Sequence, residues 1–247
     1  MTKDGYEYNQ LGERMYPDFI KEAQAVYQTT KEPALGRLLL KKQGEYTVED
    51  YFALPKECRV ELIDGVIYNM SAPSGVHQIL ALRIAGQLDA WVTQQKGDCT
   101  VIIAPADVQL DRDDRTMVQP DLFVYCRKEN EKGDQKVEWK VYDQTVFQGA
   151  PDLVAEILSP SSAKRDRNIK YSKYKSAGVR EYWIVDPKLR RVTVHCFEQG
   201  DRTTVNTYQE EIPVYIFDGR CRISLADMEK RERLLSETTA VKTQEIQ

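Results

Sequence analysis

Apolar residues recur at helical spacing near the start of the chain and again after residue 77. Over 77–94 they form a single stripe, which predicts an amphipathic helix packed on a core: Leu80, Ile84, Leu88 and Trp91. Within residues 1–46 the same spacing predicts one short amphipathic helix: Phe19, Ile20, Ala23, Val26 and Tyr27. Runs typical of buried strands cover 99–110, 116–125, 152–158, 180–186, 191–197 and 203–217.

Turn-forming and capping residues divide these runs. Asp64-Gly65 separates two short apolar runs and predicts a two-residue β-hairpin over 59–70. Three more helices are predicted from their end residues: 49–54 after Thr47, 159–178 ending at Gly178, and 224–236 after Ser224. The polar stretch 127–149 reads as an insertion or a hairpin between two core strands.

The order of these elements predicts an α+β fold with a mixed β-sheet flanked by helices. We expect an N-terminal extension over 1–46, one domain over 47–235 and a disordered tail over 236–247.

Two carboxylates lie inside runs that predict buried strands. Asp121 is the third residue of the run Gln-Pro-Asp-Leu-Phe-Val-Tyr, at the start of its strand-like part. Glu156 lies within the run Leu-Val-Ala-Glu-Ile-Leu. An ionised carboxylate left unpaired in such a place is costly, so a metal ion or a lysine is expected to compensate its charge. Asp152 also follows a proline, but its place at a strand start beside a turn is more typical of a turn residue.

Paired carboxylates of this kind suit metal-assisted hydrolysis. Mg²⁺, or Mn²⁺ in its place, takes carboxylate oxygens together with water and a substrate phosphate. The ion polarises a phosphoryl oxygen and lowers the pKa of a bound water, and a nearby lysine can orient that water. Asp121 and Glu156, on neighbouring strands, can supply the two ligands.

A basic segment begins soon after Glu156. Six bases occur there beside one acid, Asp166: Lys164, Arg165, Arg167, Lys170, Lys173 and Lys175. Basic helix faces are often only solvated, but after a candidate metal-ligand strand this one predicts a local phosphate-binding surface. Tyr171 and Tyr174 interleave with the bases and are more typical of core than of base stacking. The candidate DNA contacts are Lys164, Arg165, Arg167 and Lys173.

Four segments carry a pattern that belongs to a known family. They are Val-Gln-Pro-Asp-Leu at 118–122, Val-Ala-Glu-Ile-Leu-Ser-Pro-Ser-Ser at 154–162, Arg-Asp-Arg-Asn-Ile-Lys-Tyr at 165–171 and Gly-Val-Arg-Glu-Tyr-Trp-Ile-Val-Asp-Pro at 178–187. Together they resemble the Uma-type putative restriction endonucleases of the PD-(D/E)XK nuclease-like superfamily. The likeness also takes in Val-Glu-Leu-Ile-Asp-Gly at 60–65 and the loop 71–77, and covers about residues 46–230.

The resemblance implies a restriction-endonuclease-like fold and Mg²⁺-dependent cleavage of DNA. It makes Asp121 the aspartate of the PD half-motif, Glu156 the acidic residue of the second half, and Glu61 an additional acidic residue at the metal. Leu158 stands where the superfamily has its lysine. In this family the lysine is expected on the following helix, where Lys170 would position or activate the attacking water. A homodimer is also implied, because cutting both strands requires two sites.

Three candidates have an ordinary structural alternative. Glu61 is equally typical of a half-exposed glutamate in a hairpin. Lys170 follows Asp166 by four residues, the spacing of a helix-surface ion pair worth about 0.2–0.5 kcal/mol. His77, at a loop-to-helix junction, could shuttle a proton or touch a phosphate as a catalytic residue, or form a hydrogen bond at the helix start.

Composition limits the setting of the protein. No apolar run approaches the roughly 18 residues that span a bilayer, and no signal-peptide pattern begins the chain, so we expect a cytoplasmic protein without a membrane partner. The five cysteines are scattered without a Cys-X-X-Cys pair, so we expect reduced thiols and neither disulfides nor a zinc site. A net charge of −4 gives no global sign of DNA binding, hence any such surface must be local.

Two other classes of function stay open. The chain could be a catalytically inactive nuclease fold that binds nucleic acid or a protein partner. Its metal site could instead act on a small phosphorylated or acidic substrate. A nucleotide-binding loop is excluded, because the chain has neither a Gly-X4-Gly-Lys-Ser/Thr motif nor a strand-linked Gly-X-Gly-X2-Gly motif.

Overall fold

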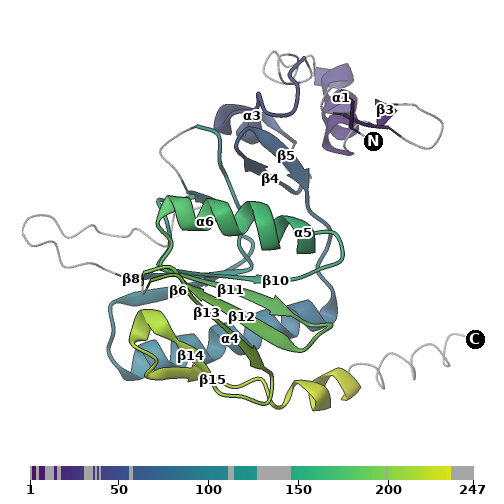
Figure 1. Cartoon of the computed structure of the whole chain (residues 1–247). Coiled ribbons are helices and arrows are strands. Elements are labelled where there is room, and N and C mark those ends of the chain that lie inside the picture. Colours follow the sequence, from purple (N-terminus) through teal and green to yellow (C-terminus); the bar gives the residue numbers. More distant parts are fainter. Residues whose placement is uncertain are drawn as a thin grey trace, which may run out of the picture. The chain divides into compact units, whose positions relative to one another are not determined.

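The computed structural model describes residues 2–3, 6–8, 14–15, 18–30, 36, 38, 40–55, 58–110, 114–126, 146–198 and 200–234 (Figure 1). The chain forms two compact units, each described here by itself. The first unit comprises Met1–Ala72, Asp107–Gln119 and Val146–Gly149. The second unit comprises Pro73–Ala106, Pro120–Thr145 and Ala150–Gln247.

Short elements around a separate core build the first unit. They include α1 (Asp18–Thr30), α3 (Val48–Ala53), β1 (Thr2–Lys3), β2 (Tyr6–Tyr8), β3 (Arg14–Met15), β4 (Val60–Ile63), β5 (Val66–Asn69), β7 (Asp107–Gln109) and β9 (Val146–Gln148). Strands β1, β2 and β3 pair in that order, β4 pairs with β5, and β7 runs parallel to β9. Ile20 and Ala23 of α1 are buried with Leu62 and Met117, so one side of α1 packs on this core.

Local sequence explains α3 and the β4–β5 hairpin. The Thr47 hydroxyl accepts a hydrogen bond from the Asp50 N–H, and Asp50 Oδ2 accepts one from the Thr47 N–H at 2.7 Å, which confirms the predicted helix cap. At the hairpin turn, Asp64 and Gly65 have φ angles of 51° and 78°. A Cβ atom at residue 65 would lie 2.6 Å from the Gly44 carbonyl oxygen, so the turn requires glycine there.

A six-stranded mixed sheet forms the centre of the second unit. Its strands, in spatial order, are β13 (Arg202–Thr207), β12 (Arg191–Cys196), β11 (Glu181–Asp186), β10 (Leu153–Ile157), β8 (Leu122–Cys126) and β6 (Cys99–Ile103). Strands β10 and β11 are parallel, and the other neighbours are antiparallel. A parallel pair requires a crossover connection, which the helical segment between β10 and β11 provides.

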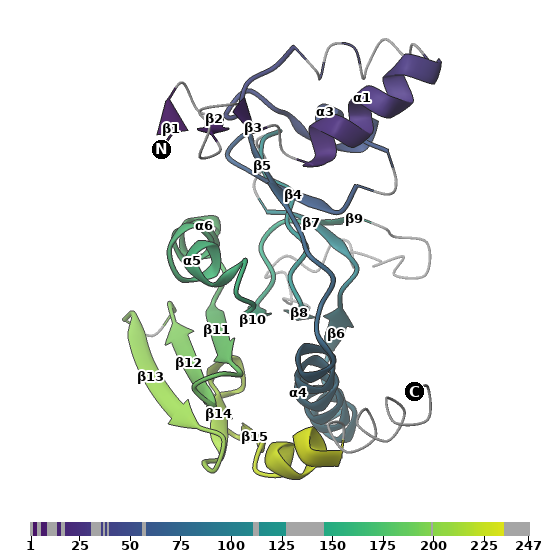
Figure 2. The same ribbon diagram turned by 90° about the vertical axis from the view of Figure 1, so that its right-hand side faces the viewer.

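Different layers cover the two faces of this sheet. One face packs on α4 (Gly75–Gln94), the hairpin of β14 (Ile212–Val214) and β15 (Cys221–Ile223), and the 3-10 helix η3 (Tyr215–Phe217). The other face carries α5 (Ala163–Arg165), the π-helix η2 (Asp166–Lys170) and α6 (Tyr171–Ala177), and Figure 2 shows α4 and α6 on opposite sides. Side-chain alternation along β10 turns its odd-numbered residues toward α4 and Glu156 toward η2 and α6.

These layers confirm the predicted α+β fold with a mixed sheet flanked by helices, although several predicted boundaries differ. The helix predicted over 159–178 is three consecutive segments, and it ends as predicted at Gly178, which has a left-handed conformation. The run 99–110 forms two strands instead of one, and the last helix begins at Met228 instead of directly after Ser224.

Parts of the predicted organisation fall outside the described residues. They are positions 127–145 of the predicted insertion and the predicted tail over 236–247. The boundary at residue 46 stays a prediction. No helix in the described part of the chain combines the length and the apolar character needed to cross a membrane.

The prediction of reduced cysteines without disulfides is wrong for one pair. Cys99 and Cys126 are direct partners across β6 and β8, with 4.0 Å between their Cα atoms, and they form a disulfide. They are 27 positions apart in the sequence, so only the strand register brings them together. Cys58, Cys196 and Cys221 are free thiols.

Glu181, the first residue of β11, is a buried carboxylate on the α4 side of the sheet. Its Oε1 accepts a hydrogen bond from Trp183 Nε1 at 2.7 Å, and its Oε2 accepts one from the Ile216 N–H at 2.7 Å. Burial nevertheless raises the pKa of the Glu181 carboxyl to about 7. A carboxyl whose pKa is higher in the folded than in the unfolded state favours folding most at low pH.

The variant Glu181→Gln is therefore expected to remove a pH dependence of stability. Both states hold the proton below the ordinary pKa of 4.5, and between 4.5 and about 7 only the folded state holds it, so wild-type stability falls across this window. The loss is on the order of 3 kcal/mol. Urea unfolding at a series of pH values gives the free energy of unfolding of both proteins. The loss is measured as the change with pH in the wild-type value minus the variant value. A difference that stays constant with pH would contradict the assignment.

Candidate active site

Asp121 lies immediately before β8, where the β8–β10 ladder ends. Its Oδ2 accepts a hydrogen bond from the Ile157 N–H at 2.7 Å, so the side chain takes the place of a ladder carbonyl. Leu122 pairs with Ala155 in this ladder, which puts Asp121 opposite Glu156. Asp121 itself lies outside the ladder. Its side chain contacts the Ile157 N–H at the end of β10, whereas Glu156 points toward η2 and α6.

His77, in the first turn of α4, contacts the same carboxylate. Its Nε2 lies 3.0 Å from Asp121 Oδ2, within hydrogen-bond distance. The Ser74 hydroxyl accepts a hydrogen bond from the His77 N–H at 3.3 Å. His77 Nδ1 is buried without a hydrogen-bond partner among the described residues. The histidine thus sits at the helix start and also at the candidate site.

Glu156 is 4% exposed and receives two side-chain donors on one oxygen. Lys170 Nζ lies 2.8 Å from Glu156 Oε1, and the Tyr174 hydroxyl donates to the same oxygen at 2.6 Å. A lysine therefore compensates the charge of this buried carboxylate, which is one of the two solutions expected from the sequence.

Lys170 reaches Glu156 from the π-helix η2. Lys170 is 2% exposed and Asp166 is 1% exposed, with 3.8 Å between Nζ and Asp166 Oδ1. The pair at four-residue spacing exists, but the alternative of a helix-surface pair is wrong because both side chains are buried. Tyr182 donates a hydrogen bond to the Asp166 carbonyl oxygen at 3.0 Å and ties this turn to β11. Such π-turns occur frequently at functional sites.

Glu61 lies on β4 in the first unit, whose position relative to the second unit is not determined. It is fully buried, so the alternative of a half-exposed glutamate is wrong. Its Oε1 accepts a hydrogen bond from the Gln119 N–H at 3.0 Å. Asp107 Oδ1 accepts hydrogen bonds from Gln119 Nε2 and from the Tyr51 hydroxyl, each at 2.8 Å. The metal-binding role of Glu61 stays a prediction.

The structure divides the basic segment. Lys170 points inward, and Arg167 Nη2 donates to Asp186 Oδ2 at 2.6 Å. The other candidate DNA contacts keep at least part of their surface exposed: Lys164, Arg165 and Lys173. Partly or fully exposed cations on one short helical stretch are compatible with a phosphate-binding surface, and Arg167 also has Asp186 as an acidic partner.

The donor atoms at the site suit a hard cation. Asp121, just before β8, and Glu156, in β10, offer carboxylate oxygens, and no cysteine takes part in the contacts described for them. Magnesium uses only one or two protein carboxylates and keeps several waters. Among the described residues, no group of three or more His, Cys, Asp and Glu side chains is arranged to hold a metal ion. The two carboxylates therefore do not belong to a closed protein cage in the described part of the chain, and their oxygens are the donor type that a hydrated magnesium ion takes.

Sequence reasoning missed Tyr174 and gave Asp166 only a surface role. Asp166, Lys170 and Tyr174 follow one another at intervals of four, so a helix brings all three to one side. This spacing was the available signal. Asp152 is structural, as expected: its Oδ2 accepts a hydrogen bond from the Cys126 N–H at 2.7 Å, and its Oδ1 lies 3.1 Å from Arg180 Nη1.

Comparison with known proteins identifies the family. The model of Uma2, described as a putative restriction endonuclease, matches residues 48–220. The chain belongs to the Uma2 family. This match confirms the resemblance drawn from the sequence motifs and includes Asp121, Glu156 and Lys170. Membership of the Uma2 family supports a nuclease function.

A solved structure supports the fold of this Uma2 chain. It is the crystal structure of a putative nuclease belonging to DUF820 from Anabaena variabilis, with 24% sequence identity and a TM-score of 0.56. The alignment covers 74% of this chain and 96% of that chain. No curated protein matches the chain.

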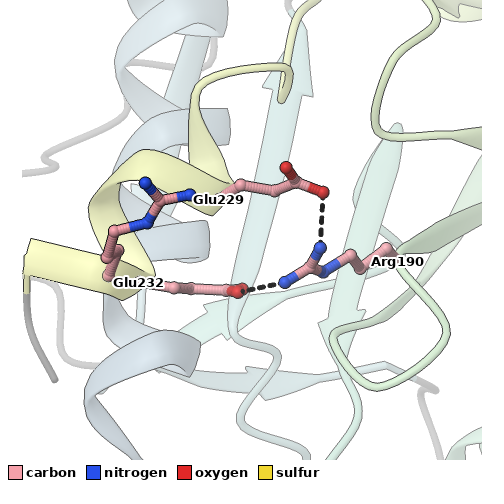
Figure 3. A pocket seen from close by; sticks show the side chains of 4 residues that line it. Arg190, Glu229 and Glu232 are labelled. Carbon is pink, nitrogen blue, oxygen red and sulfur yellow. Dashed lines mark hydrogen bonds and ion pairs between the residues drawn. The ribbon is translucent and has the colours of Figure 1, made fainter.

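A charged depression elsewhere in the second unit carries no candidate chemistry. It has a volume of about 480 Å³ and is lined by Arg190, Glu229, Glu232 and Arg233 (Figure 3). Arg190, in the β11–β12 turn, lies 2.5 Å from Glu229 Oε1 and 2.8 Å from Glu232 Oε2. The arginine therefore serves to attach the last helix to the sheet.

Substitution of Lys170 tests the buried ion pair. Lys170→Met is expected to cost about 3–5 kcal/mol of stability, because it leaves the Glu156 charge buried without its partner. Adding Glu156→Gln should recover most of this loss, because the buried charge is then absent. Urea unfolding of the three proteins measures both effects.

The matched control is Lys175→Met in the adjoining α6, which removes the exposed ion pair between Lys175 and Asp201. It should leave the urea midpoint almost unchanged. Equal losses of unfolding free energy in the two lysine variants would show that the Glu156–Lys170 contact stabilises the protein no more than an exposed ion pair does.

Proposed function

We propose that this Uma2 chain is a Mg²⁺-dependent endonuclease that hydrolyses phosphodiester bonds in DNA. One observation carries the proposal: the Ile157 N–H binds Asp121, so that Asp121 is held opposite Glu156 at the end of a strand ladder. Lys170 supports it, because it contacts Glu156 although Leu158 occupies the usual lysine position. Manganese would replace magnesium, since it also accepts carboxylate and water ligands.

Each side chain would have a separate task. Asp121 and Glu156 would bind the ion through carboxylate oxygens. An ion held there would polarise a phosphoryl oxygen of the substrate and lower the pKa of a bound water. His77 and the Ile157 N–H hold Asp121 in place before any ligand arrives. Lys170 would orient the attacking water or offset the negative charge that develops on the phosphate.

The basic segment would bind the DNA backbone close to this site. Its candidate contacts flank Lys170 in sequence, so phosphates bound there would lie near the carboxylates: Lys164, Arg165, Arg167 and Lys173. Contacts of this kind release counterions, and binding should weaken steeply with salt. A homodimer would bring two such sites to the two strands of a duplex.

A second candidate function is a nuclease-fold module that binds nucleic acid or a protein partner without cutting. One observation favours it: Lys170, at 2.8 Å, already compensates the charge of the buried Glu156. DNA binding that is independent of metal and gives no product would identify this function.

Calorimetric titration with Mn²⁺, combined with plasmid nicking on the same samples, separates the two functions. The wild type is expected to bind Mn²⁺ and to nick. Asp121→Asn and Glu156→Gln should each lose metal binding and reduce nicking by at least about a hundredfold, because each removes one of the two carboxylate ligands. Asp152→Asn is the matched control, since it alters a buried aspartate that follows a proline and binds only structural partners in the contacts described.

Each outcome is decisive. Metal binding without nicking in the wild type would move the function to another phosphorylated or acidic substrate. No metal binding in the wild type would favour the binding module. Full nicking by Glu156→Gln would overturn the assignment of the site.

A further inference from the structure

We infer that Tyr174 is a positioning residue for Glu156 and determines how tightly the site binds its metal ion. The inference rests on the proposed metal-dependent function and deepens it. Tyr174 is expected from the sequence to be a core residue, and it is fully buried in α6. Its hydroxyl, however, donates a hydrogen bond to Glu156, the candidate metal ligand.

The hydrogen bond from Tyr174 to Glu156 is short and has an anionic acceptor. The hydroxyl oxygen lies 2.6 Å from Glu156 Oε1, between two buried side chains. Hydrogen bonds to a charged group are roughly twice as strong as neutral ones. Lys170 Nζ binds the same oxygen at 2.8 Å. Two donors from separate residues fix the direction of the carboxylate better than one ammonium on a flexible stem.

Packing holds the ring of Tyr174 independently of its hydroxyl. The ring centroid lies 5.0 Å from that of Tyr182, with an interplanar angle of 54°. Tyr182 is itself anchored by its hydrogen bond to the Asp166 carbonyl oxygen. Removal of the Tyr174 hydroxyl should therefore leave the ring in place and take away only the hydrogen bond to Glu156.

The acceptor distinguishes Tyr174 from two other buried tyrosines of this unit. Tyr182 and Tyr208 donate to main-chain carbonyl oxygens, at 3.0 Å and 3.4 Å. Groups that hold a metal-binding side chain typically contribute about 10–100-fold to metal affinity or activity. Without the Tyr174 hydroxyl, Glu156 would be drawn toward Lys170 and would be a poorer ligand for the ion.

The test compares Tyr174→Phe with Tyr208→Phe in the full chain. Tyr208 is also buried, but it belongs to the core on the α4 side of the sheet. Tyr174→Phe should weaken Mn²⁺ binding in calorimetry by about 10–100-fold and raise the half-saturating Mn²⁺ concentration for nicking by the same factor. The nicking rate at saturating Mn²⁺ should stay within about threefold of the wild type, because Asp121, Glu156 and Lys170 are all retained. Tyr208→Phe should change neither quantity.

Loss of a buried hydroxyl that serves only the fold would give a different result. Both variants would then unfold at a lower temperature while their Mn²⁺ dependence stayed that of the wild type, and this would overturn the inference. A slower rate at saturating Mn²⁺ with an unchanged half-saturating concentration would also overturn it. If Tyr174→Phe is too unstable for calorimetry, the rise in melting temperature on adding Mn²⁺ makes the same comparison, and the rise should be smaller than in Tyr208→Phe.

The wild type separates this inference from the proposed function. A wild type that binds no Mn²⁺ refutes both. A wild type that binds Mn²⁺, together with a Tyr174→Phe variant of equal affinity, refutes only the role of Tyr174.

Discussion

The buried ion pair between Glu156 and Lys170 is the contact on which the candidate site depends. Taking two charges out of water is costly, and their attraction repays this only when the geometry is close and the remaining polar atoms are satisfied. Here the 2.8 Å contact is joined by the Tyr174 hydroxyl on the carboxylate and by Asp166 near the ammonium. The pair connects an inner strand of the sheet to the helix that leads to the next strand. Strand and helix are therefore stabilised together.

Topology explains why these polar groups meet at one place. The parallel strands β10 and β11 require a crossover, and the helical segment from α5 to α6 lies on the face toward which Glu156 points. Asp121 ends the ladder on the other side of β10 by binding the Ile157 N–H. This is the carboxyl end of a strand in a sheet with a parallel pair, where open sheets of α/β proteins commonly bind ligands. Elements needed for the fold thus place Asp121 beside the end of β10 and Lys170 against Glu156 of the same strand.

Local sequence predicted most of the elements, and long-range packing determined what was missed. The Asp64-Gly65 turn was predictable because these two residue types themselves favour the positive φ angles that the turn requires. The disulfide between Cys99 and Cys126 was not, because it follows from the register of two strands far apart in the sequence. At the site, the strand pattern and the family motifs indicated Glu156. The role of Tyr174 was hidden, because the spacing that directs it to Glu156 is also the spacing of an ordinary core tyrosine.

Glu156 is paired with a lysine in the free chain and is also proposed to bind a metal ion. These two cations compete for the same carboxylate. The ammonium of Lys170 stabilises the ionised Glu156 in the free chain and repels a second cation there. In the proposed reaction the DNA phosphate brings negative charge to the site, and the same ammonium then has an additional partner. The positive charge that favours folding in the absence of substrate would thus favour phosphate binding and turnover in its presence. One ion pair can in this way serve both the stability of the sheet and the proposed chemistry at its edge.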